Sequence, residues 1–369
     1  MHISSLRLFD FRNYESADIE LSEGQNLIFG ENAQGKTNLL EAIFYLSCLK
    51  TMRAGKDADA IRRDCPSAKI EGSFNAYGRD IDISCTITKT GRRLFVNGIP
   101  ETRPRDHIGL IKTVLFSPDD LQLIKEGPAL RRRFMNIAIS QLRPAYIKAL
   151  SEHNKIIESK RKILKMETGR EVYLDYLDVL NEKLARAAAY ITLERGMFLR
   201  ELMALASATM IDISQGREVL TIRYNCDSSI EDPCAEDGFE RIYEHLKRRK
   251  DAEIASEMCL VGAHRDDFTV FINGEPARDF GSQGQIRSCV LALKCAEHGI
   301  IERDSGEAPI LLLDDVLSEL DPKRREFLIN DASRGQTIIT GCDPSMFSEL
   351  RKGKIFTVSK GCIVNKTEN

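Results

Sequence analysis

Residues Gly30 to Thr37 read GENAQGKT and fit the phosphate-binding pattern G-x-x-x-x-G-K-[ST]. A short apolar run, Asn26 to Phe29, precedes them and predicts a buried strand. Residues 38–46 follow with apolar side chains at helical spacing. The order strand, glycine loop and helix directs backbone N–H groups and a helix N-terminus at an anionic phosphate. The chain is therefore predicted to bind a nucleoside triphosphate.

Four side chains, two in the phosphate loop and two acidic ones, are the candidates for binding the phosphates and Mg²⁺ and for activating the attacking water. Lys36 should reach the β- and γ-phosphates, and the Thr37 hydroxyl should ligate Mg²⁺. Residues 309–315, PILLLDD, form an apolar run that ends in adjacent carboxylates, which is typical of the end of a buried parallel strand. Beside a phosphate loop, Asp314 is placed to hold Mg²⁺ through water, and Asp315 to orient or deprotonate the attacking water. Glu319 is the next candidate for the base.

The segment Gly281 to Gln285, GSQGQ, directly precedes a predicted helix over residues 286–301. In isolation it favours a flexible loop with a serine N-cap. Its place shortly upstream of the acidic strand is that of the signature motif in a nucleotide-binding cassette. Ser282 would then act on a γ-phosphate, and a second subunit is its natural source, because the two motifs can lie far apart within one head.

Composition bounds the class of protein. The chain has 369 residues, of which 30% are charged and 42% hydrophobic, with a net charge of −3. No apolar run approaches the roughly 20 residues that span a bilayer. The ten cysteines are scattered, without a C-x-x-C pair, which predicts reduced thiols and a cytoplasmic protein. The net charge excludes a wholly basic coat protein, so any DNA binding must come from local patches.

Patterning predicts an α/β protein of two lobes. Residues 3–11 alternate as an edge strand, and the stretches 69–75, 80–88 and 92–96 alternate as an antiparallel layer. Residues 141–166 and 171–213 have long helical periodicity, interrupted at 168–170, and predict a helical hairpin too short for a long coiled coil. The predicted parts are an N-terminal head segment at 1–120, a helical lobe at 121–250 and a C-terminal head segment at 251–369.

A basic stretch is the candidate for DNA contact. Residues 125–170 contain twelve Lys or Arg and four Asp or Glu, a local balance of +8. Lys160, Arg161 and Lys162 are the first candidates for a stripe that follows phosphates, with a solvated helical face as the alternative. Arg131 and Arg132 are weaker candidates, because arginines there can fix packing. No aromatic platform accompanies the stretch, so base stacking is not indicated. His264 to Asp267 favours a structural or nucleotide-facing turn over a metal site.

Together these motifs resemble the RecF family of bacterial DNA replication and repair proteins, ABC-type ATPases similar to the structural-maintenance-of-chromosomes (SMC) proteins. The resemblance covers the chain from end to end. It rests on 8–14 (LFDFRNY), 30–38 (GENAQGKTN), 116–121 (FSPDDL), 127–134 (GPALRRRF), 262–267 (GAHRDD) and 279–285 (DFGSQGQ).

The resemblance implies a P-loop ATPase head, with a mixed sheet and an antiparallel layer, and an inserted, mainly helical second lobe. It implies ATP and Mg²⁺ as cofactors, an ATP-dependent homodimer, and slow hydrolysis stimulated by DNA. Gapped DNA, single-strand/duplex junctions and the proteins RecO and RecR are the implied partners. The implied nucleotide contacts are Arg12, Gly30, Glu31, Asn32, Ala33, Gln34, Gly35, Lys36, Thr37, Asn38, Gly281, Ser282, Gly284 and Gln285.

Departures from related patterns separate the alternatives. Ser117 stands where transporter cassettes carry a glutamine, and no histidine follows the predicted strand 337–340. These differences leave the γ-phosphate sensor unassigned and count against a transporter subunit. A nuclease-linked cassette would need a further domain of clustered acids, for which the stretch up to Asn369 has no room. Ala263 and Asn136 also depart from the family, which usually has a proline and an acid there.

Overall fold

The structure is a computed structural model that describes residues 1–52, 55–166, 174–227, 229–230, 232–332, 334–342 and 353–368. It divides into two compact units. Unit 1 comprises Met1–Leu121, Asp212–Gly216 and Arg287–Asn369, and unit 2 comprises Gln122–Ile211 and Arg217–Ile286. The three-part division stays a prediction, and the compact units differ from it in grouping residues 251–286 with the helical segments.

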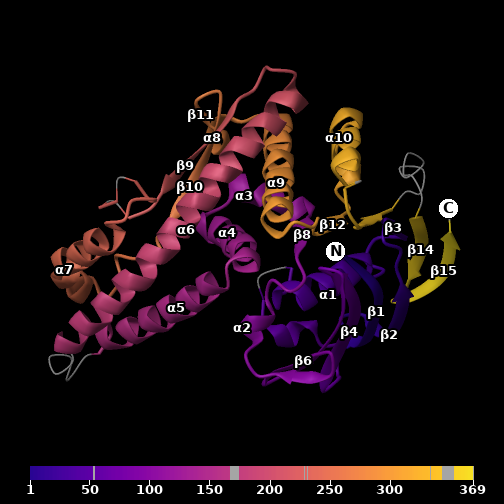
Figure 1. The fold of residues 1–369 in the computed structure, drawn as a ribbon, viewed down its shortest axis with the longest axis horizontal. Coiled ribbons are helices and arrows are strands. Elements are labelled where there is room, and N and C mark those ends of the chain that lie inside the picture. The colour runs from indigo at the N-terminus through magenta and orange to yellow at the C-terminus, as the bar shows by residue number, and fades with distance from the viewer. Residues whose placement is uncertain are drawn as a thin grey trace. The chain divides into compact units, whose positions relative to one another are not determined.

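A mixed sheet carries the phosphate loop in unit 1 (Figure 1). Its strand order is β15-β14-β3-β13-β12-β8, and all neighbours are parallel except β14 and β15. β12 and β13 are buried at every residue, as their continuous apolar runs require. The strands are β3 (Gln25–Phe29), β8 (Thr113–Phe116), β12 (Ile310–Asp314), β13 (Thr337–Gly341), β14 (Gly353–Ser359) and β15 (Cys362–Glu368).

The predicted antiparallel layer is confirmed as a second sheet of unit 1, in the order β2-β1-β4-β5-β6-β7. The expectation that residues 3–11 form an edge strand is wrong, because β1 pairs with both β2 and β4. Its alternating side chains fit this place, since one face packs on the core. The strands are β1 (His2–Phe11), β2 (Tyr14–Glu20), β4 (Ser67–Ala76), β5 (Arg79–Thr88), β6 (Gly91–Val96) and β7 (Ile99–Glu101).

Helix α1 (Lys36–Cys48) contacts strands of both sheets in unit 1 (Figure 1). Eleven of its side chains are buried, from Lys36 to Cys48, so the helix after the phosphate loop is a core element. The other helices outside unit 2 are α2 (Pro104–His107), α9 (Gln283–Ser305), which begins in unit 2, and α10 (Pro322–Ala332). Short 3₁₀ helices cover Asp57–Ala60, Pro118–Leu121 and Leu317–Glu319.

Unit 2 is mainly helical and contains α5 (Pro144–Leu164) and all but the last residues of α6 (Leu174–Ser214), which are the predicted pair of long helices. The predicted interruption at 168–170 lies outside the described residues. A small sheet has the order β11-β10-β9. Across the described ranges, no helix combines the length and apolar character that a bilayer crossing requires. The remaining elements are α3 (Gln122–Lys125), α4 (Pro128–Leu142), α7 (Gly238–Ser256), α8 (Ala277–Phe280), β9 (Leu220–Asn225), β10 (Asp267–Ile272) and β11 (Glu275–Pro276).

Candidate nucleotide site

The phosphate loop connects β3 to α1 through backbone conformations that favour glycine. Gly30, Ala33 and Gly35 have φ angles of 156°, 63° and 116°. Gly35 is the N-cap of α1 and has no side chain that could cap the first N–H groups of the helix. The first N–H groups of a helix have no partner within the helix, so this end is suited to an anion. The geometry is that of a phosphate cradle.

Lys36 is directed into the loop. Its side chain is 7% exposed, and its ammonium donates to the carbonyl oxygen of Gly30 and, at 3.1 Å, to that of Glu31. A phosphate entering the loop would compete with these carbonyls for the ammonium, as a charge-assisted bond is the stronger one. Lys36 is therefore where the motif requires it.

The predicted Mg²⁺ ligands, Thr37 and Asp314, meet although they lie far apart in the sequence. The Thr37 hydroxyl donates to the two Asp314 carboxylate oxygens at 2.8 and 3.0 Å. Asp314 is 8% exposed at the end of β12, and Thr340 on β13 also donates to it, at 2.8 Å. A hydroxyl beside a fixed carboxylate fits Mg²⁺, which is usually held by few protein groups together with phosphates and water.

Asp315, the predicted catalytic base, sits at the turn that ends β12. Its φ is 53°, and its backbone N–H donates to the Thr340 hydroxyl at 3.0 Å. Within the described ranges its half-buried carboxylate has no hydrogen bond or ion pair, which leaves it open to a water molecule. Glu319 is the alternative base. One of its carboxylate oxygens lies 3.7 Å from a guanidinium nitrogen of Arg287, in a partly exposed ion pair. The geometry favours Asp315.

Arg12, which the resemblance assigns to the nucleotide, is engaged within the protein. Its guanidinium donates to both carboxylate oxygens of Glu41 at 2.7 and 2.8 Å and to the Asp59 carbonyl at 2.6 Å. Glu41 lies on α1, so Arg12 ties the β1–β2 turn to the helix that follows the loop. Contact between Arg12 and a nucleotide stays a prediction.

The signature segment belongs to unit 2 and begins α9. The Ser282 hydroxyl accepts from the Gln285 N–H at 3.3 Å, and the Gln285 side chain accepts from the Ser282 N–H at 2.9 Å. This reciprocal pair is a capping box. Ser282 is exposed, so the serine cap and a surface available to a ligand are both present. The two signature glycines, Gly281 and Gly284, are half-buried beside it.

Two residues at the end of β13 escaped the sequence analysis. Thr340 positions both Asp314 and Asp315, and Cys342 lies next to the loop, with its sulfur 3.2 Å from the Lys36 ammonium and 2.9 Å from the Asn32 amide oxygen. In the sequence, this segment was notable only because it lacks the histidine that transporter cassettes carry there. The signal that could have found the two residues is the parallel pairing of β13 with β3 and β12, which brings the three strand ends to one edge.

The segment His264 to Asp267 is a structural turn in unit 2. Asp266 accepts from Arg195 at 2.7 Å and from Tyr224 at 2.5 Å, and burial raises the pKa of its carboxyl. Burial also lowers the pKa of His264 to about 4, which keeps its imidazole neutral near pH 7. In the part of the chain that the structure describes, no cluster of His, Cys, Asp and Glu could hold a metal ion.

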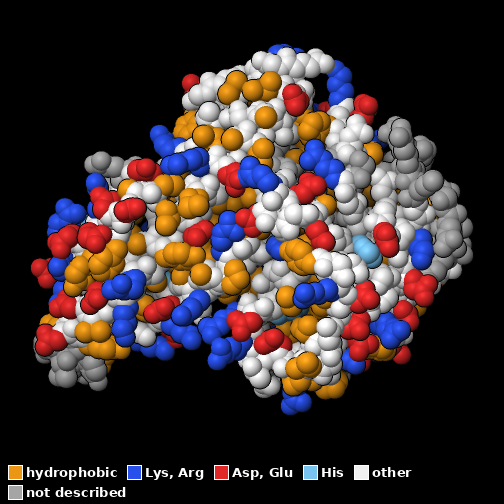
Figure 2. Space-filling view, viewed as in Figure 1, with side chains coloured by type: hydrophobic (Ala, Val, Ile, Leu, Met, Phe, Trp, Pro, Cys, Tyr) orange, Lys and Arg blue, Asp and Glu red, His pale blue; other side chains and the backbone are white. Residues whose placement is uncertain are grey.

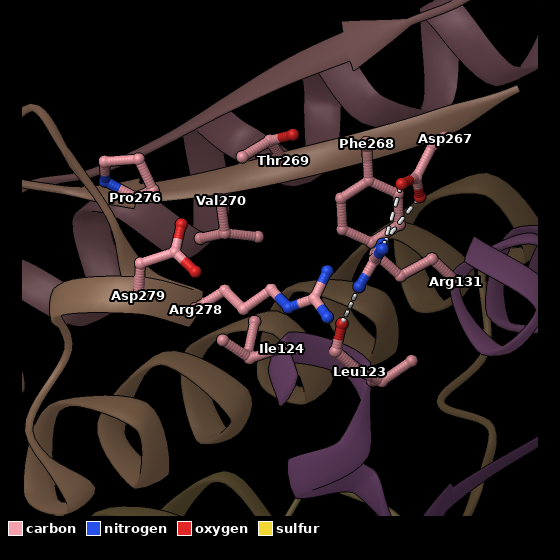
Figure 3. Close-up of a pocket in the computed structure, with 10 residues that line it drawn as sticks. All are labelled: Leu123, Ile124, Arg131, Asp267, Phe268, Thr269, Val270, Pro276, Arg278 and Asp279. Atoms are coloured by element: carbon pink, nitrogen blue, oxygen red, sulfur yellow. Dashed lines mark hydrogen bonds and ion pairs between the residues drawn. The ribbon is translucent and has the colours of Figure 1, made fainter. Parts of the chain in front are cut away.

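Arg131 also has a structural place. It is 6% exposed and forms a two-pronged ion pair with Asp267, at 2.6 and 2.9 Å (Figure 3). Its remaining N–H groups donate to the carbonyls of Leu123 and Glu126. The pair borders a cavity of about 180 Å³, whose other lining residues include Phe268. Arg132 donates to the Asp266 carbonyl at 2.9 Å, so both arginines are engaged within unit 2. Contact between either arginine and DNA stays a prediction.

Lys160 does not lie on the exposed basic stripe that the sequence predicted, because its side chain is only 1% exposed. Its ammonium donates to Glu253 on α7 at 2.7 Å and to Asn181 on α6 at 2.6 Å. Helical spacing explains the difference, since Lys160 falls on the inner face of α5 with the buried Ile156 and Ile163. Arg161 and Lys162 are exposed on the outer face and remain candidates for DNA contact.

Known proteins resemble this chain over nearly its whole length. Residues 2–364 match the family described as RecF/RecN/SMC N terminal domain. DNA replication and repair protein RecF of Listeria monocytogenes is 38% identical over 367 residues, which cover 98% of this chain and 99% of the relative. RecF of Bacillus subtilis is 37% identical over 372 residues, covering 99% of this chain and all (100%) of the relative.

Solved structures agree with the sequence relatives. A structure described as the recombination mediator protein RecF-ATP in the RecFOR pathway matches with a TM-score of 0.90 and 32% identity, covering 99% of this chain and 97% of that one. An SMC head domain from Pyrococcus furiosus matches with a TM-score of 0.57 and 18% identity, covering 100% and 96%, which shows a shared fold alone. The chain therefore belongs to the RecF family of DNA replication and repair proteins, and its fold is the SMC-like head with a helical unit.

Proposed function

We propose that this chain is an ATP-driven DNA-binding protein of recombinational repair and replication restart. ATP and Mg²⁺ bring two copies together, and the dimer binds gapped DNA or single-strand/duplex junctions. It assists RecO and RecR in loading the recombinase, and slow hydrolysis stimulated by DNA releases it. The observation that carries the proposal is the meeting of Thr37 and Asp314 beside a complete phosphate loop.

The residues of the site have different roles in nucleotide binding and hydrolysis. When bound, Mg²⁺ would be held by Thr37 and by Asp314 through water, and would neutralise charge on the phosphates. Lys36 and the α1 N-terminus bind the β- and γ-phosphates. Asp315 accepts a hydrogen bond from the attacking water and takes its proton. The Thr340 hydroxyl accepts a hydrogen bond from the Asp315 backbone N–H at 3.0 Å and so holds Asp315 in place.

Asp315→Asn is expected to retain ATP binding and ATP-driven dimerisation but to lower the hydrolysis rate at least about 100-fold, because an amide cannot accept the proton. Phosphate release under saturating ATP measures the hydrolysis rate. Glu319→Gln is the matched control and should hydrolyse ATP at the rate of the unaltered protein. Turnover that survives in Asp315→Asn and disappears in Glu319→Gln would move the base to Glu319.

The dimer follows from the place of Ser282. It is exposed at the N-terminus of α9, and its capping bonds leave its hydroxyl hydrogen available, in the described part of the chain, for a phosphate oxygen. The positive end of a helix of 23 residues favours the same anion. A γ-phosphate bound between Ser282 of one copy and the phosphate loop of another favours the dimer, and its loss on hydrolysis removes that differential affinity.

The DNA surface is proposed on the outer face of α5. Lys155, Arg161 and Lys162 are exposed there, and Lys162 forms an exposed ion pair with Glu158, at 2.8 Å. Such pairs are weak, so a DNA phosphate can replace the carboxylate. On the face shown in Figure 2, Lys and Arg side chains alternate with Asp and Glu over the long helices. The stripe is therefore a local contact and not a broad positive field.

Changing Lys155, Arg161 and Lys162 to Glu is expected to weaken DNA binding similarly for all sequences, while ATP-driven dimerisation survives. The slope of log K against log salt should become shallower by up to roughly 0.9 for each lost duplex contact. Fluorescence anisotropy over a series of salt concentrations measures both. Lys160 is left unchanged, because a glutamate there would face the buried Glu253.

The matched control changes Arg79, Lys89 and Lys323 to Glu. These residues are exposed in unit 1, and the net charge of the protein changes by the same amount. An equal loss of DNA affinity in both triple variants would show that net charge alone matters. An unchanged salt slope in the α5 variant would contradict this surface and direct the search to residues 50–63 or 92–105.

A further inference from the structure

Gln34, within the phosphate loop, is held by two segments from opposite ends of the chain. Its carbonyl oxygen accepts from the Asn13 amide at 2.9 Å and from the backbone N–H of Gly361 at 3.0 Å. Its side-chain oxygen accepts from the backbone N–H of Lys360 at 2.5 Å. The next carbonyl, that of Gly35, accepts from the Tyr14 hydroxyl at 3.0 Å. Two successive peptide groups of the loop are thus anchored from outside it.

Close packing joins the same three segments. A Cβ on Gly361 would lie 2.5 Å from the Asn13 carbonyl oxygen, and one on Gly35 would lie 2.7 Å from the Asn13 side chain. A Cβ on Gly30 would lie 2.3 Å from the Val358 carbonyl oxygen, on β14. Side chains essentially never approach so closely. Glycine at these positions therefore lets the β1–β2 turn, the phosphate loop and the β14–β15 turn touch through their backbones.

The sheet dictates where the last turn falls. β14 runs parallel to β3, with Thr357 beside Phe29, the residue that directly precedes the loop. Lys360 and Gly361 then reverse the chain with φ angles of 49° and 72°, as a two-residue hairpin turn requires. The turn lies at the loop because of strand register, so its contacts with Gln34 are fixed by the fold.

Anchoring a carbonyl fixes the direction of the N–H in the same peptide group. In a trans peptide the two groups point to opposite sides. The bonds on the Gln34 carbonyl therefore aim the Gly35 N–H away from the anchoring segments. The Tyr14 bond on the Gly35 carbonyl, together with those from the Asn38 and Leu39 N–H groups of α1, fixes the Lys36 N–H in the same way. Converging N–H groups are what a phosphate loop offers to its ligand. The anchors act on the groups that bind phosphate.

We propose that Lys360 and Gly361, together with Asn13, form a positioning clamp that holds the phosphate loop in its nucleotide-binding shape. The loop has three residues at positive φ, and such conformations persist only when surrounding structure supports them. A loop that is already ordered loses less freedom on binding, which raises affinity. The clamp rests on nucleotide binding within the proposed function and is independent of its DNA and partner steps.

Gly361→Ala tests the clamp, because the new methyl group meets the Asn13 carbonyl and drives the turn from Gln34. The expected result is an ATP Kd raised roughly tenfold or more, since small misplacements of binding groups have effects of this size. Titration with a fluorescent ATP analogue measures it. The hydrolysis rate at saturating ATP should stay close to that of the unaltered protein, so the change appears in KM and not in kcat.

Gly98→Ala is the matched control. Gly98 has a φ of 76° in another hairpin turn of unit 1, and a Cβ there meets no atom within 4 Å. It introduces the positive-φ backbone strain without the clash, and the Kd for ATP should stay unchanged. A Kd raised equally in both variants would show that general destabilisation of the fold lowers ATP affinity, and would overturn the proposal.

Lys360→Ala keeps the backbone N–H that binds Gln34 and removes the ammonium. Unchanged ATP affinity is expected. A loss as large as that of Gly361→Ala would assign the effect to a direct contact between the ammonium and the nucleotide, and would overturn the clamp. Unaltered affinity in Gly361→Ala would overturn it as well and leave the proposed function standing. Failure of the unaltered protein to bind ATP would contradict the proposed function itself.

Discussion

Lys36→Met is expected to abolish ATP binding, raising the Kd at least about 100-fold, while the protein stays folded. The ammonium is the only positive charge that the phosphate-loop pattern supplies to the β- and γ-phosphates. Methionine keeps the length of the side chain and leaves a buried, apolar end near the Gly30 carbonyl. Isothermal titration with ATP and Mg²⁺ measures the Kd, and circular dichroism checks the fold. ATP affinity equal to that of the unaltered protein would contradict the assignment of the loop.

Arg195→Met is expected to lower the free energy of unfolding of unit 2 by about 3–5 kcal/mol, because it leaves a buried carboxylate without its cation. Arg195 is 2% exposed and bonds to Tyr146 at 3.0 Å, to Asn136 at 3.0 Å and to Asp266 at 2.7 Å. These partners come from α4, α5 and the turn before β10. The guanidinium therefore joins the elements of the helical unit.

Urea unfolding measures the loss, and Arg200→Met on the same helix is the control. Arg200 is exposed and lies 3.4 Å from the exposed Asp232, so its loss should lower the unfolding free energy by less than about 1 kcal/mol. Without Arg195 the pKa of Asp266 rises further, and the folded state then binds a proton that the unfolded state releases. Stability of the variant should accordingly fall as pH rises above the ordinary pKa of a carboxyl group. Equal losses in the two variants would show that Arg195 has no central role.

The candidate nucleotide site could be predicted from the sequence because local patterns specify it. The phosphate loop, its flanking strand and helix, and the apolar strand that ends at Asp314 are each contiguous. Their meeting depends on strand order, since β13 lies between β3 and β12. Thr340 reaches both acids only through that order, and this is why the sequence analysis missed it.

Burial on a helix limited the prediction of the DNA surface. Three consecutive basic residues on α5 look alike in sequence, yet at 3.6 residues per turn they cannot share one face. Lys160 falls inward and pairs with Glu253, which lies 93 residues later in the chain. Arg131 similarly pairs with Asp267 across 136 residues. Charge counts along a sequence cannot show such partners, because the fold supplies them.

Sedimentation velocity of the protein with and without ATP and Mg²⁺ tests the central claim, that ATP drives two copies together. We expect a monomer without nucleotide, a dimer with ATP, and a larger complex when gapped DNA is added. Ser282→Arg should bind ATP and remain a monomer, because its long cation occupies the space meant for the partner's γ-phosphate. A protein that stays monomeric with ATP and gapped DNA, or a Ser282→Arg variant that dimerises normally, would contradict the account.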